Sequence, residues 1–94
     1  MTFAIHYSNR FRKQYKKLDR SGDKEVVVKL KTVITLLSEG KSLPAIFHDH
    51  KLVGKLQDFR ECHVCPDWLL IYKVYEDCLV LELVATGTHS ELFK

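Results

Sequence analysis

Residues 59–75 read FRECHVCPDWLLIYKVY, and this stretch decides the fold. It contains two runs rich in β-branched and aromatic residues, 59–64 and 69–75, on either side of Pro66-Asp67. Runs of this length and composition around a turn-forming pair are typical of adjacent antiparallel strands. We therefore predict a β-hairpin at the centre of the chain.

The strand pattern continues on both sides of this hairpin. Further β-prone runs occupy residues 52–56 and 78–85, each set off from the hairpin by a short polar pair. Connections of this length suit neighbouring antiparallel strands. We expect four consecutive strands in a meander.

The N-terminal half carries a helical pattern after one short strand. Residues 3–7 alternate with period two, and Ser8 then offers an N-cap for an amphipathic helix that closes near Gly22. Asp23 can cap a second helix, for which Gly40 supplies the stop. The order β-α-α-β-β-β-β predicts the α+β class, with a helical hairpin packed on one face of a mostly antiparallel sheet.

Length and composition favour one small cytoplasmic domain spanning residues 1–94. The chain has 94 residues and 46% hydrophobic content, which leaves no room for a second core. Its longest apolar runs, 68–72 and 78–81, are far shorter than the ~20 residues of a membrane span. The first residues lack the pattern of a secretory signal, so we expect the three cysteines to be free thiols.

Positive charge is concentrated in the predicted helices. The net charge is +3 for the whole chain, but residues 10–31 hold nine basic against three acidic side chains, which gives +6 there and −3 elsewhere. Such a surface suits a polyanion, because phosphate contacts supply most sequence-independent affinity for nucleic acids. A solvated helix face is the simpler alternative. The basic residues are Arg10, Arg12, Lys13, Lys16, Lys17, Arg20, Lys24, Lys29 and Lys31.

Three histidines and an aspartate lie at predicted strand ends or in loops, where they can meet at one edge of the sheet. They are His50, His63, Asp67 and His89. RNA cleavage through its own 2′-hydroxyl needs a base, an acid and positive charge near the phosphate, but no metal. Histidine suits both proton-transfer roles near neutral pH. An isolated histidine is more often an ordinary surface residue, so only the group of four indicates chemistry.

A zinc site is the competing interpretation, since Cys62 and Cys65 form a C-x-x-C pair. Residues three apart on a strand point to opposite faces, so both thiols would reach one ion only if Pro66 bends the chain early. A second pair of ligands at metal-binding spacing is also missing. We expect no metal and no other cofactor.

Three stretches together resemble a known family. They are residues 43–54 (LPAIFHDHKLVG), residues 59–73 (FRECHVCPDWLLIYK) and residues 86–93 (TGTHSELF). In this order and spacing they resemble the YafQ-like toxins of the RelE/ParE superfamily of toxin–antitoxin systems. The resemblance is specific from residue 43 onward and implies a RelE-like fold.

The resemblance also implies a ribosome-dependent messenger-RNA endonuclease, monomeric when alone and neutralised by a cognate antitoxin. It makes His50, His63, Asp67 and His89 catalytic, and Phe93 a support for the substrate. We expect His89 to be the general acid, with His50 or Asp67 taking the 2′ proton. The basic helices would then dock on ribosomal RNA through Arg10, Arg12, Lys13, Lys16 and Lys17.

One position departs from the family pattern. Relatives often have arginine directly before the T-G-T-H motif, where this chain has Ala85. We expect Arg60, Lys51 or Lys55 to supply the missing positive charge to the substrate, or activity to be lower. The alternative function is a non-enzymatic poison on the same fold, like the ParE branch that inhibits DNA gyrase. Several converging proton carriers would be unnecessary in such an inhibitor.

Overall fold

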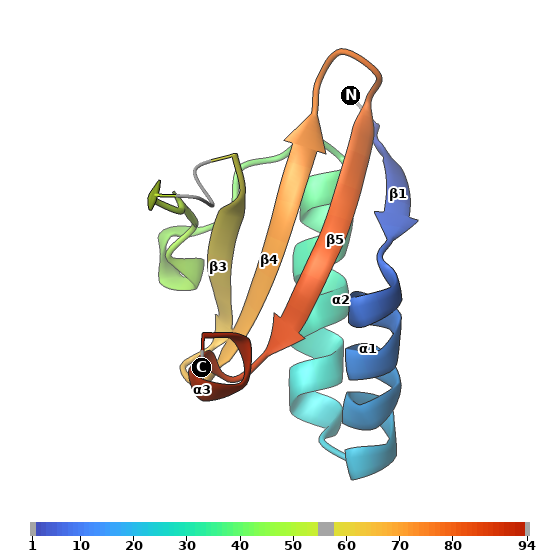
Figure 1. Cartoon of the computed structure of the whole chain (residues 1–94), viewed down its shortest axis with the longest axis vertical. Helices are drawn as coiled ribbons and strands as arrows, with labels where there is room; N and C mark the ends of the chain where they lie inside the picture. The colour runs from blue at the N-terminus through green and yellow to red at the C-terminus, as the bar shows by residue number, and fades with distance from the viewer. Residues whose placement is uncertain (1, 55–57, 94) are drawn as a thin grey trace.

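The computed structural model describes residues 2–54 and 58–93. Figure 1 shows a twisted sheet with two long helices on one face and a short C-terminal helix at its lower end. The elements are β1 (Ala4–Tyr7), α1 (Asn9–Ser21), α2 (Lys24–Ser38), the 3₁₀ turn η1 (Ala45–Phe47), β2 (His50–Lys51), β3 (Arg60–Cys65), β4 (Trp68–Tyr75), β5 (Val80–Gly87) and α3 (His89–Leu92).

The sheet has the strand order β1-β5-β4-β3-β2. β2 to β5 form the predicted antiparallel meander, and β1 pairs with β5 in parallel at the opposite edge. β1 can run parallel to β5 because a long connection, which includes the α1–α2 hairpin and strands β2 to β4, joins the two strands. The predicted α+β class and its helical hairpin are confirmed.

The helix ends follow the predicted caps. The Ser8 side chain accepts a hydrogen bond from the backbone N–H of Phe11 at 3.0 Å, and Asp23 Oδ1 accepts one from Val26 at 3.3 Å. Gly22 ends α1 in the left-handed region, with φ 78°. These caps confirm both predicted helix starts and the turn between them.

The core lies between the helices and one face of the sheet. Leu30 from α2 packs against Cys62, Leu70 and Leu81 from the three long strands, and all four are fully buried. Because side chains alternate along a strand, the residues next to these point to the other face. That second face is free of long helices and is available for a functional site (Figure 1).

Two elements differ from the prediction. The strand expected at residues 52–56 is wrong for its described part, residues 52–54, because β2 ends at Lys51 and Gly54 turns the chain with φ 72°. Residues 55 and 56 lie outside the described part. The helix α3 was not predicted. It forms because Thr88 and Glu91 make a capping box, a signal that the short C-terminal sequence does contain.

Candidate functional site

Side chains of strand β3 point alternately to the two faces of the sheet. Cys62 and Val64 point into the core, whereas Glu61 and His63 point to the face without long helices. Glu61 is only 6% exposed, which is unusual for a carboxylate because burying a charge is costly unless it is paired. This burial indicates that Glu61 has partners on that face.

The partners of Glu61 are two of the predicted catalytic histidines. β2 pairs with β3 so that His50 lies opposite Glu61. His50 Nε2 is 3.5 Å and His63 Nε2 is 3.6 Å from the same oxygen, Oε1 of Glu61. The two rings are 6.3 Å apart between centroids. When either imidazole is protonated, it forms an ion pair with Glu61.

His48 completes this group, which we call the histidine–glutamate cluster (His48, His50, Glu61, His63). His48 ends η1 in the left-handed region (φ 47°), a conformation uncommon for a residue with a side chain. Its carbonyl oxygen accepts a hydrogen bond from His50 Nδ1 at 2.7 Å. A carbonyl only accepts, so Nδ1 of His50 donates this bond and its Nε2 faces Glu61. The His48 ring also lies 5.5 Å from that of His63.

Sequence reasoning missed Glu61 and His48. The signal for Glu61 was available, since it lies two residues before His63 and so shares its face of the strand. The pairing of Glu61 with His50 was not, because it depends on the register between β2 and β3.

Asp49, between His48 and His50, holds this segment in place. Asp49 accepts two hydrogen bonds from Arg60, at 3.3 and 3.0 Å, and a third from the hydroxyl of Tyr72. Tyr72 is 1% exposed, and burial together with Asp49 raises its pKa well above the usual value. The hydrogen bond to Asp49 raises the pKa of Arg60 as well. This Asp49–Arg60–Tyr72 clamp fixes the segment that carries His50.

We predict that Asp49→Ala lowers the free energy of unfolding by about 1–3 kcal/mol, because it leaves the buried Tyr72 hydroxyl and the Arg60 guanidinium without their acceptor. Urea denaturation measures the loss. Asp49→Asn keeps part of the acceptor geometry and should lose less, while Asp58→Ala, at an exposed loop position, should lose nothing. Equal stability of Asp49→Ala and the parent chain would mean that the clamp is dispensable.

The sheet register brings the third histidine to the same end of the sheet. His63 on β3 lies opposite Leu69 on β4, and Leu69 lies opposite Gly87 on β5. Neighbouring strands are about 4.8 Å apart, so the backbones of His63 and Gly87 are separated by about 10 Å. His89 follows Gly87 by two residues and begins α3.

A capping box and contacts with α1 and β5 hold α3 in place. The backbone N–H of Thr88 donates to Glu91 at 2.9 Å, which is the main reason that the pKa of Glu91 is lowered. Lys17 of α1 lies 3.7 Å from the other oxygen of Glu91. A Cβ on Gly87 would come within 3.2 Å of Glu91, so α3 packs directly on the end of β5. These contacts orient the helix that carries His89.

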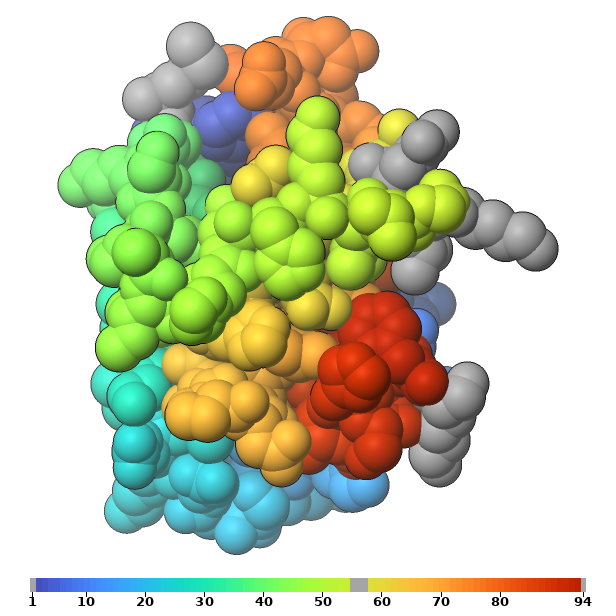
Figure 2. Space-filling model, turned by 90° about the vertical axis from the view of Figure 1, so that its left-hand side faces the viewer, coloured from blue at the N-terminus to red at the C-terminus, as the bar shows by residue number. Residues whose placement is uncertain are grey.

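The remaining predicted residues lie around the same edge. Figure 2 shows the η1–β2 segment, the β3–β4 turn and α3 side by side on one face of the molecule. Asp67 is exposed in that turn. The Phe93 ring lies 5.1 Å from the ring of His89, at the end of α3. All four predicted catalytic residues therefore belong to segments that meet on this face.

The basic residues predicted to bind the substrate or the ribosome lie on several different elements. Arg60 is held by Asp49 and projects from β3 on the side of Tyr72, opposite to Glu61 and His63. Lys51 is exposed on β2 beside His50, Ala85 is fully buried, and Lys55 lies outside the described residues. The basic residues predicted to bind the ribosome are all exposed on α1: Arg10, Arg12, Lys13, Lys16 and Lys17.

The cysteines do not form a metal centre in the described parts of the chain. Within residues 2–54 and 58–93, no three His, Cys, Asp or Glu side chains are grouped as ligands for an ion. The register does shift between His63 and Cys65. Even so, Cys62 is fully buried, and burial raises its pKa to about 12, so it stays a neutral thiol. All three cysteines are free, as predicted.

The described helices are also too short or too polar for a bilayer, since none between residues 2–54 and 58–93 meets the length and hydropathy of a transmembrane span.

The sequence and the fold are both similar to those of bacterial toxins. The family model of the YafQ toxin of bacterial type II toxin–antitoxin systems matches residues 3–94. The mRNA interferase toxin YafQ of Escherichia coli K12 is 42% identical over 90 residues, which cover 95% of this chain and 94% of that protein.

Two solved structures are similar over nearly their whole length. The E. coli DinJ–YafQ complex contains a chain with a TM-score of 0.86 and 38% identity, covering 98% of this chain and 99% of that one. A metal-bound toxin from Helicobacter pylori has a TM-score of 0.85 and 40% identity, covering 99% and 100%. Family model, sequence and fold agree, and the chain belongs to the YafQ family of toxins of bacterial type II toxin–antitoxin systems.

Proposed function

We propose that this toxin is a ribosome-dependent endoribonuclease that cleaves messenger RNA by attack of the substrate's own 2′-hydroxyl. The observation that carries the proposal is the histidine–glutamate cluster. The η1–β2 segment of this cluster lies on the same face as the β3–β4 turn and α3, the segments to which Asp67 and His89 belong (Figure 2). The name of the 42% identical E. coli relative, mRNA interferase toxin, supports the same substrate.

The reaction needs one proton removed and one delivered. A base takes the proton of the 2′-hydroxyl, whose oxygen attacks phosphorus and forms a 2′,3′-cyclic phosphate. The bond from phosphorus to the 5′ oxygen breaks, and an acid protonates that oxygen. His89 is exposed on α3 and suits the acid. His50, whose Nε2 faces Glu61, or Asp67 suits the base. These groups supply the proton transfers without a metal.

A synthetic message on programmed ribosomes tests this mechanism. The toxin, first treated with a chelator and desalted, should cut the message and leave a 2′,3′-cyclic phosphate. A single 2′-deoxy nucleotide at the cut should block cleavage there, because the nucleophile is gone. Cutting that survives this substitution would overturn the mechanism. Growth arrest without any RNA cutting would favour the gyrase-inhibitor alternative.

We predict that Glu61→Gln lowers kcat for message cleavage by about 10- to 100-fold, the size of one lost hydrogen bond to a charged group. Glutamine keeps the shape of the side chain but cannot form an ion pair with His50 or His63. KM should not change, since Glu61 is buried and does not reach the substrate. Glu76→Gln, at an exposed turn, is the control. An unchanged kcat for Glu61→Gln would contradict a positioning role.

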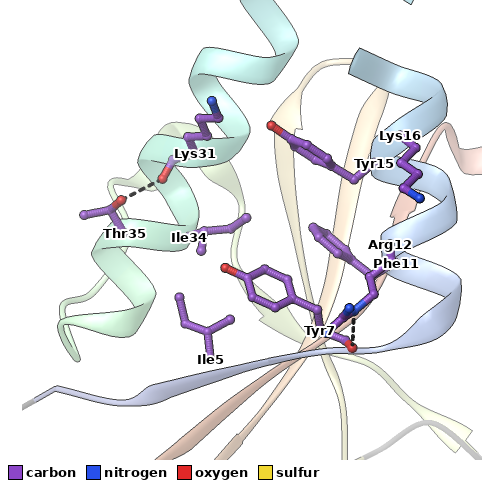
Figure 3. A pocket seen from close by; sticks show the side chains of 9 residues that line it. All are labelled: Ile5, Tyr7, Phe11, Arg12, Tyr15, Lys16, Lys31, Ile34 and Thr35. Carbon is purple, nitrogen blue, oxygen red and sulfur yellow. Dashed lines mark hydrogen bonds between the residues drawn. The ribbon is translucent and has the colours of Figure 1, made fainter. Parts of the chain in front are cut away.

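We further propose that a cognate antitoxin binds the helical hairpin, as a known relative forms the DinJ–YafQ complex. Figure 3 shows a groove between α1, α2 and β1, with apolar side chains between the helices and Lys16 and Lys31 on its sides. Its volume is about 750 Å³. An acidic segment with apolar anchors fits both features. The lining residues are Ile5, Tyr7, Phe11, Arg12, Tyr15, Lys16, Lys31, Ile34 and Thr35.

The same groove suggests how neutralisation works. Arg12 and Lys16 line the groove and also belong to the surface expected to contact ribosomal RNA. An antitoxin seated there would cover part of that surface and so prevent docking on the ribosome. Neutralisation would then leave the histidine–glutamate cluster untouched.

We predict that Lys16→Glu slows association with the antitoxin encoded by the neighbouring gene by about tenfold at low salt, because it reverses charge at the edge of the groove. Lys24→Glu, exposed on α2 outside the groove, should have a smaller effect. Surface plasmon resonance gives both rates. If the two gene products elute separately at low salt, the antitoxin proposal is wrong.

A further inference from the structure

A cleft beside the histidine–glutamate cluster has no role in the chemistry above. It lies between η1, the end of β3 and α2, and its volume is about 510 Å³, within the range of small-ligand sites. Its lining residues are Lys29, Ile46, Phe47, His48, His63, Val64, Cys65 and Pro66.

Two residues of the histidine–glutamate cluster also line the cleft. His63 and His48, whose rings are 5.5 Å apart, line the cleft and belong to the cluster. A group in the cleft is therefore next to the residues that exchange protons. In Figure 2 the η1–β2 segment lies directly over the β3–β4 turn on this face, where both bound the cleft.

The lining suits a ligand with a largely apolar surface. Ile46 is 76% exposed, a high value for an isoleucine that extends from a 3₁₀ turn into the edge of a cleft. Phe47 is half-buried behind it, and Pro66 closes the side of the β3–β4 turn. Single-stranded RNA is commonly held through bases that contact aromatic and apolar side chains.

Charge at the cleft fits the backbone of such a ligand. Lys29 of α2 lines the cleft, and its Nζ is 3.1 Å from Glu25 one helical turn away. This pair raises the pKa of Lys29, so the side chain stays positively charged. An ammonium group at this position can also contact a phosphate that follows a bound base.

We propose that this cleft holds one nucleobase of the RNA substrate, adjacent to the phosphate that is cleaved. The inference rests on the proposed endonuclease function and assigns it a base-binding subsite formed by η1, β3 and α2. Contact with a base there would position the 2′-hydroxyl and phosphate against His50 and His63. It would also make cleavage depend on the presence of a base at one nucleotide of the message.

The test combines a protein variant with an altered message. Ile46→Ala removes an exposed side chain and should not affect folding, and Val53→Ala is the matched control, because Val53 is 88% exposed and outside the cleft. Messages on programmed ribosomes carry a single abasic nucleotide at successive positions around the cut. For the parent toxin, one such position should lower kcat/KM by about tenfold or more, as expected for loss of one stacked base.

The decisive result is the coupling between the two changes. Ile46→Ala should lower kcat/KM by about tenfold on the intact message, because the base loses part of its apolar contact, and it should be nearly insensitive to the abasic nucleotide at that one position. Val53→Ala should behave like the parent toxin on every message. If the losses from Ile46→Ala and from the abasic nucleotide multiply, the base is not in the cleft and the subsite is overturned. A parent toxin that cuts no intact message would instead overturn the proposed function, and the subsite with it.

Discussion

Alanine at His50, His63, Asp67 or His89 is expected to lower the rate of message cleavage by about 10²- to 10⁴-fold, the usual loss of one general acid or base. His50 and His63 both lie beside Glu61, and His89 lies at the start of α3, close to the end of β5. Each variant should also stop inhibiting growth when it is expressed in cells. None of the four residues belongs to the buried core, so each variant should still fold, with some loss of stability for His50→Ala and His63→Ala because Glu61 loses a partner.

A histidine elsewhere on the same sheet is the matched control. His6 is exposed on β1 and lies 3.6 Å from Glu82, an arrangement similar to that of His50 and Glu61. His6→Ala should arrest growth as fast as the parent toxin. If all four variants of the candidate catalytic residues also arrested growth at that speed, the catalytic assignment would be wrong.

The local signals in the sequence were sufficient for the helices. Ser8 and Asp23 cap the helices at the predicted places, and Gly22 turns the chain between them. Caps depend on residues within one turn of each other, so they can be seen in one sequence. The capping box of Thr88 and Glu91 is equally local, and α3 was missed only because its four residues carry no hydrophobic period.

The edge of the sheet could not be predicted in the same way. Residues 52–56 have β-prone composition, but strand formation needs a partner in register. Among residues 2–54 and 58–93, the pairing of β2 with β3 includes His50 and Lys51 and stops before Leu52. The same pairing brings His50 to Glu61. The cluster therefore depends on a cross-strand contact that no local pattern encodes.

Ala85 stands where relatives often have arginine, and the structure shows which side chains could replace that positive charge. Ala85 is fully buried opposite Ile71, and Arg60 is held by Asp49 on the other side of β3. Neither side chain brings a cation to the face of His63. Lys51, the other described candidate, is exposed on β2 next to His50. With little positive charge from these residues near His63, we expect the reaction to depend more on the ribosome that holds the message.

The second large effect expected is that of the ribosome itself. We predict that the purified toxin cleaves a message on programmed ribosomes about 10³-fold or more faster than the same message free in solution. Cleavage requires the 2′ oxygen, the phosphorus and the leaving oxygen to lie nearly in line. Prealigned reactants gain roughly 7 to 11 kcal/mol over free ones, so a ribosome that supplies half of this alignment gives an effect of that size.

The arrangement of charge on the toxin fits this division of roles. The exposed cations of α1 can contact ribosomal RNA, and Lys17 of this helix lies 3.7 Å from Glu91 in α3, next to His89. Docking through α1 would therefore fix the position of the catalytic end relative to the codon. The measurement compares one transcript with and without ribosomes and maps the new 5′ ends. Equal rates in the two samples would refute ribosome dependence, because the toxin alone would then supply the whole alignment.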